Sequence, residues 1–190
     1  VTGRRVRVLR EAGGEARKQS VQEGRARLTV VDGLGGGLRA TDAAQAGTRA
    51  AAEAGIESPN PMIEGLHRAM SGTRGGAVAV ATLPLAGGEL QFSGIGNINA
   101  GIADAANYRG LASMPGIVGV QYRKAQAFNV HAAHGTLLLM HSDGLQGRWR
   151  LQDYPGLVHR HPALVVAVLQ RDFDRGRDDA SIVALRMGAW

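Results

Sequence analysis

Hydrophobic and polar residues alternate along two short runs near the start of the chain. The run RRVRVLREA, residues 4–12, has the period-two pattern of a half-exposed strand. Residues 27–31 are mostly apolar and lead into Asp-Gly and a glycine-rich turn, which indicates a second strand with a tight exit. The chain is therefore predicted to begin with two strands.

Three later segments carry the signals of helices. Residues 38–55 are rich in alanine, the strongest helix former, and residues 62–72 show a shorter helical pattern. Pro59 and Pro61 are expected to break the chain between these two segments. Residues 161–173 place valine and leucine at helical spacing, with a proline near the first turn.

From residue 75 the pattern changes to short apolar runs separated by glycine-rich turns, which is typical of antiparallel strands. The predicted strands are residues 76–85, 89–97, 98–104, 109–112, 117–122, 126–130, 134–144 and 178–187. This order of elements predicts an α+β fold with two packed sheets and helices outside. We expect a single domain over residues 1–190, because no repeat or internal boundary divides the chain.

Composition narrows the class of protein. The 190 residues include no cysteine, which excludes disulfides, thiolate metal sites and cysteine nucleophiles. No apolar run approaches the roughly 20 residues that span a bilayer, so we expect a soluble cytoplasmic protein without a membrane partner.

The net charge of +6 raises the question of nucleic-acid binding. The arginines are scattered without a basic stripe at helical spacing, and no aromatic residues are interleaved with them to stack bases. Nucleic acid is therefore disfavoured as a partner, and the charge suits a solvated surface or an acidic protein partner.

Acidic residues recur where apolar strands begin or end. Asp32 follows LTVV, Asp143 follows LLLMHS, Asp178 and Asp179 precede ASIVAL, and Glu15 lies between the first two predicted strands. Carboxylates are the ligands that Mg²⁺ and Mn²⁺ prefer, and clustered carboxylates repel one another unless a cation neutralises them. Taken singly, each residue is better explained as a turn or a solvated strand end, and spacing does not establish that they converge.

Five motifs, in order, resemble those of one protein family: VVDGLGGGLRATDAA, TRGGAVAVA, LQFSGIGNINAGI, LLLMHSDGLQGRW and QRDFDRGRDDASIVALR. From about residue 14 to residue 186, the chain resembles the SpoIIE-type bacterial metal-dependent Ser/Thr protein phosphatases of the PPM superfamily, in particular their small RsbX-like members. The resemblance implies an α-β-β-α sandwich of two mainly antiparallel sheets flanked by helices. It also implies two divalent cations, Mn²⁺ or Mg²⁺, in a cleft at the sheet edges.

The resemblance assigns roles to residues of this chain. Asp32, in the Asp-Gly-Leu-Gly motif, would bridge both metals, and the backbone carbonyl of Gly33 would bind one of them. Asp143, in the Ser-Asp-Gly motif, and Asp178, the first member of the Asp-Asp pair, would be further ligands. Asp179 would take a neighbouring role behind the ligands.

Two positions depart from the family pattern. Relatives carry Gly-Asp in the N-terminal segment, where this chain has Gly14-Glu15, so Glu15 would be either the corresponding ligand or a solvent-facing residue of a loop. Relatives often carry histidine at position 36, where this chain has glycine, so any role of that histidine is lost.

The reaction implied by the resemblance is hydrolysis of phosphoserine or phosphothreonine by a hydroxide that bridges the metals. Strand alternation would place His141 on the side of Asp143, where it would protonate the leaving alkoxide or make a structural hydrogen bond. Arg74 would bind phosphate or lie on the surface. Asn97 would form a hydrogen bond near the cleft or shape a turn.

The resemblance also implies a class of substrate. It would be a phosphorylated bacterial signalling protein with a STAS domain, such as an anti-anti-sigma factor or a stressosome scaffold. The alternative function is that of a pseudophosphatase that keeps the fold as a partner-binding module, and the glutamate at position 15 motivates it.

Overall fold

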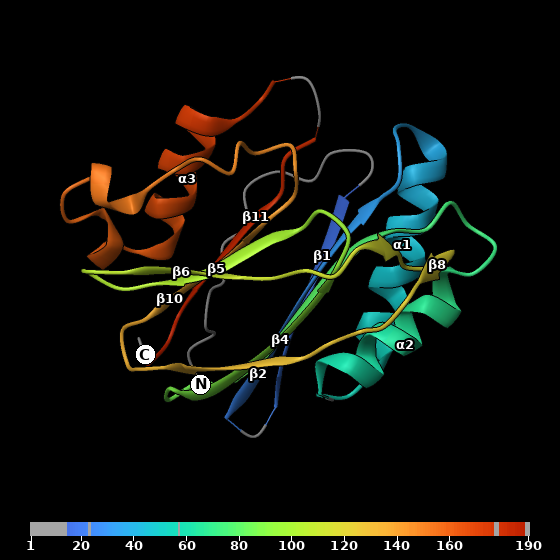
Figure 1. Cartoon of the computed structure of the whole chain (residues 1–190), viewed down its shortest axis with the longest axis horizontal. Coiled ribbons are helices and arrows are strands. Elements are labelled where there is room, and N and C mark those ends of the chain that lie inside the picture. Colours follow the sequence, from blue (N-terminus) through green and yellow to red (C-terminus); the bar gives the residue numbers. More distant parts are fainter. Residues whose placement is uncertain (1–14, 23, 57, 177–178, 189–190) are drawn as a thin grey trace.

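Antiparallel strands of the chain form two facing sheets in the computed structural model, which describes residues 15–22, 24–56, 58–176 and 179–188 (Figure 1). The five-stranded sheet has the order β1-β2-β3-β4-β9, and the four-stranded sheet has the order β11-β10-β5-β6. The strands of the first sheet are β1 (Glu15–Gln22), β2 (Arg25–Gly33), β3 (Gly76–Pro84), β4 (Gly88–Ile95) and β9 (Phe128–Ala132). Those of the second are β5 (Asn99–Ala103), β6 (Tyr108–Leu111), β10 (Leu137–His141) and β11 (Ile182–Arg186).

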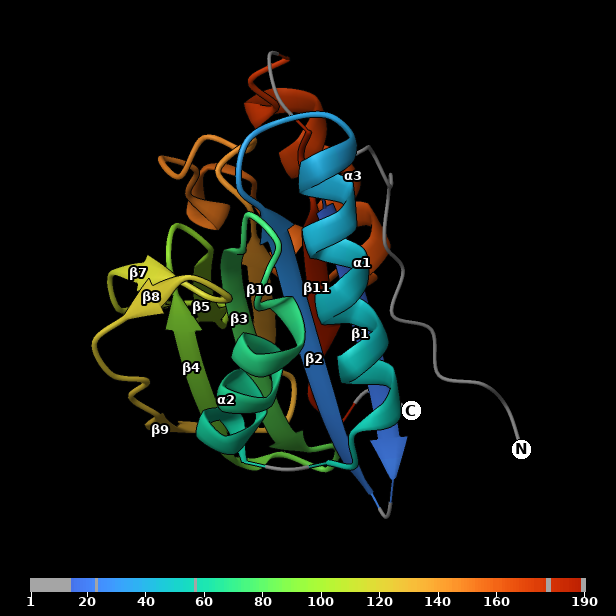
Figure 2. The same ribbon diagram turned by 90° about the vertical axis from the view of Figure 1, so that its right-hand side faces the viewer.

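Helices cover the outer faces of the two sheets. Figure 2 shows α1 (Leu38–Glu53) and α2 (Pro59–Met70) in front of the five-stranded sheet, and α3 (Pro162–Phe173) lies against the other sheet, where it contacts β11. Two short 3-10 helices, η1 (Leu151–Asp153) and η2 (Leu157–His159), precede α3. The predicted α+β class and the α-β-β-α sandwich are confirmed.

The period-two pattern explains the three apolar cores of the sandwich, which lie between the sheets, under α1 and α2, and under α3. In β2, Ala26, Leu28 and Val30 belong to the core between the sheets, and Val31 belongs to the core under α1 and α2. In β10, Leu138 faces the inter-sheet core while its neighbours pack under α3. Strands that are covered on both faces lose the polar half of the alternation, which is why both β2 and β10 read as nearly continuous apolar runs.

Several predicted elements need correction. Residues 15–22, which the sequence reading left between strands, form β1, while the predicted strand at residues 4–12 lies outside the described residues. Residues 117–122 form two short strands, β7 (Gly116–Ile117) and β8 (Gln121–Tyr122), rather than one. Helix α2 begins at Pro59, because a proline in the first helical turn gives up no intrahelical hydrogen bond.

The side chain of Arg27 is buried in the sandwich although it carries a charge. Arg27 of β2 is fully buried, and its guanidinium donates hydrogen bonds to the backbone carbonyls of Ala51, Ala54 and Gly55 at the C-terminal end of α1. The last carbonyls of a helix lack intrahelical donors and carry partial negative charge, so a cation at this position satisfies both needs. Arg27 thereby attaches α1 to the sheet.

None of the helices in the described part of the chain is both long and apolar enough to cross a membrane.

Candidate active site

Asp32 lies at the edge of the apolar core between the two sheets. It continues the row of Leu28 and Val30, which face the opposite sheet, and its side chain is half-exposed. The next residue, Gly33, packs closely against α1. A Cβ at this position would overlap the backbone carbonyl of Ala40. Only glycine allows the helix to approach the strand this closely, so the Asp-Gly pair fixes the turn that follows the carboxylate.

Asp143 follows β10 at the edge of the other sheet and is also half-exposed. Nδ2 of Asn97 donates a hydrogen bond of 2.6 Å to its Oδ2. Asn97 lies in the turn between β4 and β5, the point where the chain crosses from one sheet to the other. The crossover therefore supplies the donor that holds this carboxylate.

A short series of contacts leads from Asp32 to Asp143. Asp32 is paired in register with Ala77 of β3, and a Cβ on Gly96 would lie 2.6 Å from the Cβ of Ala77. Gly96 adjoins Asn97, which contacts Asp143. The structure thus brings these two predicted site residues to the same edge of the sandwich.

The loop before β11 lies against the turn after β10. Ser142 donates its backbone N–H to the Ser181 carbonyl at 3.1 Å, and its hydroxyl accepts from the Ser181 N–H at 3.0 Å. A Cβ on Gly144 would overlap the carbonyl oxygen of Asp179, so these two segments are in direct backbone contact. Asp179 therefore lies beside Asp143, whereas Asp178 lies outside the described residues.

Glu15 is the register partner of Asp32 across β1 and β2. Residues at directly opposite register positions belong to the same face of a sheet. The backbone thus places position 15 next to the predicted metal site at the start of a strand, which corrects the expectation of a loop. The role of the Glu15 carboxylate as a metal ligand stays a prediction.

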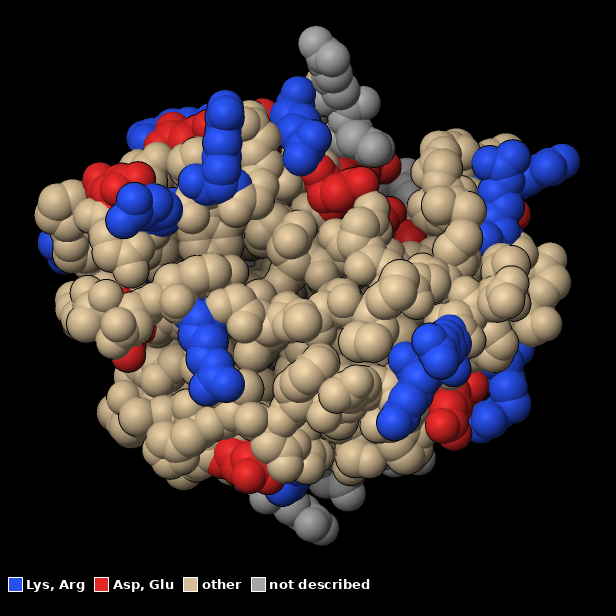
Figure 3. Space-filling view, in the orientation of Figure 1, with Lys and Arg blue, Asp and Glu red and all other residues tan. Residues whose placement is uncertain are grey.

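Charged residues surround this edge unevenly. In Figure 3, acidic side chains gather near the ends of β1 and β11, and basic side chains stand on both sides of them. Among the described residues, no group of three or more His, Cys, Asp or Glu side chains is placed to hold a metal ion. The predicted ligand set therefore depends on Glu15 and Asp178 in addition to Asp32 and Asp143.

No family model and no curated protein matches the chain. Among solved structures, a chain described as "The bacterial stressosome: a modular system that has been adapted to control secondary messenger signaling" aligns with a TM-score of 0.82 and 27% identity, over 96% of this chain and 95% of that one. RsbX in complex with magnesium aligns with a TM-score of 0.75 and 16% identity, over 93% of this chain and 88% of RsbX.

The PP2C phosphatase domain of SpoIIE from Bacillus subtilis, with a fragment of its regulatory domain, aligns with a TM-score of 0.67 and 19% identity over 96% of this chain and 62% of that chain. The fold is that of the PP2C-type phosphatases. In this PP2C-type sandwich the acidic residues described above stand at the rim between the two sheets.

His141 belongs to the packing of the PP2C-type sandwich. The imidazole is 2% exposed, and its Nδ1 lies 2.8 Å from the carbonyl oxygen of Ser142 while its Nε2 accepts from the indole N–H of Trp149 at 3.1 Å. A carbonyl only accepts and an indole only donates, so the ring is neutral with its proton on Nδ1. Burial lowers the pKa of His141, although the Ser142 carbonyl opposes this shift.

These contacts argue against the acid role that was predicted for His141, because both ring nitrogens are engaged in the interior. The strand ends at His141, so its alternation does not extend to Asp143, and the two side chains make separate contacts. The structural hydrogen bond, the other reading of His141, is the one that the geometry favours.

Arg74 stands above the glycine-rich loop that follows Asp32. It is exposed, and its Nη1 lies 3.0 Å from the position that a Cβ on Gly35 would occupy. The loop is tied to the same segment by a hydrogen bond of 2.9 Å from the N–H of Leu34 to the carbonyl of Gly75. The Arg74 side chain thus lies beside the loop that follows Asp32, and its role in phosphate binding stays a prediction.

Sequence reasoning missed three residues near this edge: Gln146, Arg148 and Arg175, which line one hollow. The two arginines were read as scattered surface charge. Their only sequence signal is that Arg148 follows the Ser-Asp-Gly motif closely and that Arg175 closely precedes the Asp-Asp pair.

Proposed function

We propose that the chain is a divalent-metal-dependent phosphatase of phosphoserine and phosphothreonine in proteins. The observation that carries this proposal is the contact of Asn97 with Asp143, at the edge of the sandwich where Asp32 also lies. The similarity to the SpoIIE phosphatase domain supports the reaction class.

The donor set suits Mn²⁺ or Mg²⁺, and we propose a pair of these cations. Asp32, Asp143 and Asp178 would provide carboxylates, Gly33 its backbone carbonyl, and Glu15 a further carboxylate from the paired strand. All are oxygen donors, which hard divalent cations select. The similarity to RsbX, which was solved with magnesium, supports this assignment.

Residues of the chain would bind the phosphoryl group and orient the metal ligands around it. The bound cations would lower the pKa of a water molecule and offset charge on the phosphoryl oxygens. Asn97 donates to the Asp143 carboxylate, and the backbone of Asp179 lies against Gly144, the next residue of the same turn. Arg74 would donate to phosphoryl oxygens from the glycine-loop side. No side-chain nucleophile takes part in this scheme.

The proposed substrate is a phosphorylated STAS-domain protein of a bacterial signalling system. The similarity to a chain of the bacterial stressosome supports this choice. The enzyme would reset a switch that controls a stress response or a sigma factor, in the cytoplasm. Nucleic acid is not proposed as a partner, since the basic side chains in Figure 3 form no continuous stripe on that face.

The second candidate function is that of a pseudophosphatase that binds a partner without turnover. Glutamate in place of aspartate at position 15 favours it.

Hydrolysis of p-nitrophenyl phosphate and of a phosphorylated STAS protein, with and without Mn²⁺, separates the two functions. We expect Mn²⁺-dependent turnover that Asp143→Asn lowers at least about a hundredfold, as is usual when charge stabilisation at a reacting centre is lost. Glu89→Gln serves as the control, since Glu89 is exposed near the start of β4, whereas the site lies beyond its end. A wild-type protein without Mn²⁺-dependent turnover would leave the pseudophosphatase as the function.

A further inference from the structure

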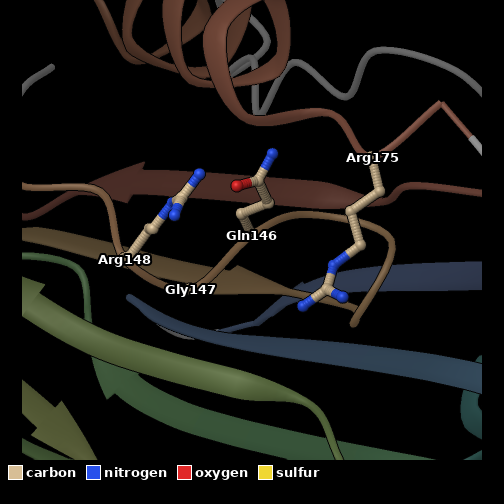
Figure 4. A pocket seen from close by; sticks show the side chains of 4 residues that line it. All are labelled: Gln146, Gly147, Arg148 and Arg175. Atoms are coloured by element: carbon tan, nitrogen blue, oxygen red, sulfur yellow. The ribbon is translucent and has the colours of Figure 1, made fainter.

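A hollow of about 490 Å³ opens beside the edge of the sandwich that holds Asp32 and Asp143, called the acidic edge below. It is lined by Gln146, Gly147, Arg148 and Arg175. Figure 4 shows the two arginine side chains at this hollow, with the amide of Gln146 between them. Arg148 belongs to the loop after β10, and Arg175 follows the end of α3.

Backbone hydrogen bonds hold the walls of this hollow together. The N–H of Gln146 donates to the carbonyl of Phe173 at 2.9 Å, and the N–H of Arg175 donates to the carbonyl of Gly144 at 3.0 Å. Leu145 and Asp174 form an antiparallel bridge between these two bonds. The two loops therefore form a short ladder, and the arginines project from a defined backbone.

The arginine charges are uncompensated within the described part of the chain. Neither Arg148 nor Arg175 forms an ion pair there, and both are exposed. The nearby carboxylate of Asp174 instead accepts from the backbone N–H of Gly176 at 2.7 Å. By contrast, Arg171 is paired with Asp172 at 2.6 Å. Two guanidinium groups and an amide that share one hollow form a donor set for an anion.

The position of the hollow relates it to the proposed reaction. Gly144, whose carbonyl is bonded to Arg175, directly follows Asp143. A polypeptide with a phosphorylated side chain at the acidic edge would therefore pass its neighbouring residues over Arg148 and Arg175. The +6 net charge of the chain also favours an acidic segment over a basic one.

We propose that this hollow is a specificity site for a carboxylate side chain that neighbours the phosphorylated residue of the substrate protein. Arg148 and Arg175 would bind the carboxylate, and Gln146 would add a neutral donor. This inference rests on the proposed phosphatase function and adds the sequence preference of its substrate.

Kinetics on matched phosphopeptides test the proposal. One peptide carries Asp and Glu beside the phosphoserine, and its partner carries Asn and Gln. We expect the wild-type protein to favour the acidic peptide in kcat/KM by about tenfold or more, through KM, because hydrogen bonds to charged groups are the strong ones. In the double variant R148Q/R175Q this ratio should fall to about one, while the control Arg160→Gln, an exposed arginine of the loop before α3, should retain it.

A direct binding measurement separates failure of this inference from failure of the proposed function. Fluorescence anisotropy with the unphosphorylated acidic peptide requires no turnover, and we expect R148Q/R175Q to bind about tenfold more weakly than the wild-type protein. The proposal would be overturned if the wild-type protein had the same kcat/KM for both peptides, or if the double variant bound the acidic peptide as tightly as the wild-type protein does. It is also overturned if the double variant keeps the peptide preference and loses only inhibition by inorganic phosphate, which would make the hollow a phosphate site.

Discussion

The side-chain amide of Asn97 donates a hydrogen bond to the carboxylate of Asp143, two residues beyond the pair Asn99 and His141 that ends the β5–β10 ladder. Asn97 lies in the crossover from β4 to β5, and Asp143 lies in the turn after β10. The Asp143 carboxylate is therefore held by the segment that enters β5 from β4.

Replacement of Asn97 by alanine should lower kcat/KM for p-nitrophenyl phosphate by about tenfold, because the Asp143 carboxylate would lose the donor that orients it. The Mn²⁺ concentration for half-maximal activity should rise as the carboxylate loses its orientation. Asn97 is exposed, so the free energy of unfolding should change by no more than about 0.5 kcal/mol. Unchanged kinetics and Mn²⁺ dependence would show that the contact has no part in the site.

Replacement of Gly144 by alanine should separate the turn after β10 from the segment before β11, since the new Cβ would overlap the carbonyl oxygen of Asp179. We expect a loss of about 1–3 kcal/mol in the free energy of unfolding, as for other overpacked sites. Gly147→Ala is the matched control in the same loop, where the nearest atom to the new Cβ lies 4.0 Å away. Urea denaturation of both variants measures the difference, and equal stability would contradict the close approach.

Replacement of Arg27 by methionine should destabilise the protein by about 3 kcal/mol, because the carbonyls at the end of α1 would lose their buried donor. Methionine retains the apolar stem, so the loss reports on the guanidinium rather than on a cavity. Arg25→Met is the control, since Arg25 is exposed in the same strand. Thermal and urea unfolding measure both, and a loss of similar size at Arg25 would refute the capping role.

The free energy of unfolding should fall as the pH decreases below about 6.5, because burial lowers the pKa of His141 in the folded protein. In that range the unfolded chain binds a proton that the folded chain excludes, whereas above it both states are neutral at this residue. One such group contributes a slope of at most about 1.4 kcal/mol per pH unit.

The variant His141→Gln should have a smaller slope when unfolding is measured in urea without added divalent cations. The variant His159→Gln, which changes an exposed histidine, provides the comparison. Equal slopes in the wild-type protein and in His141→Gln would contradict the buried neutral imidazole.

The fold was largely predictable from the chain, because alternation and turn chemistry are local signals. Residues 27–31 were predicted as a strand, and β2 contains them. The errors arose where a local signal was ambiguous. The prolines near residue 60 look like breakers, yet a first helical turn accepts them, and residues 15–22 lack the apolar alternation that marked the other strands.

The site was only partly predictable. The acidic residues at strand ends were visible in the sequence, and family resemblance named their roles. Alternation alone placed His141 on the side of Asp143, but the strand stops at His141 and the ring turns to Trp149. No pattern indicated that Arg148 and Arg175 share a hollow, because they come from loops that a backbone ladder brings together.

Local patterns in the chain identify most of its strands and helices and the carboxylates at their ends. Which of those ends meet depends on how the strands pair and pack. Glu15 is opposite Asp32, and Asn97 reaches Asp143, through strand register and a crossover between sheets. The physical reason is that side-chain period encodes burial along one strand, whereas pairing between strands depends on the packing of the whole sandwich.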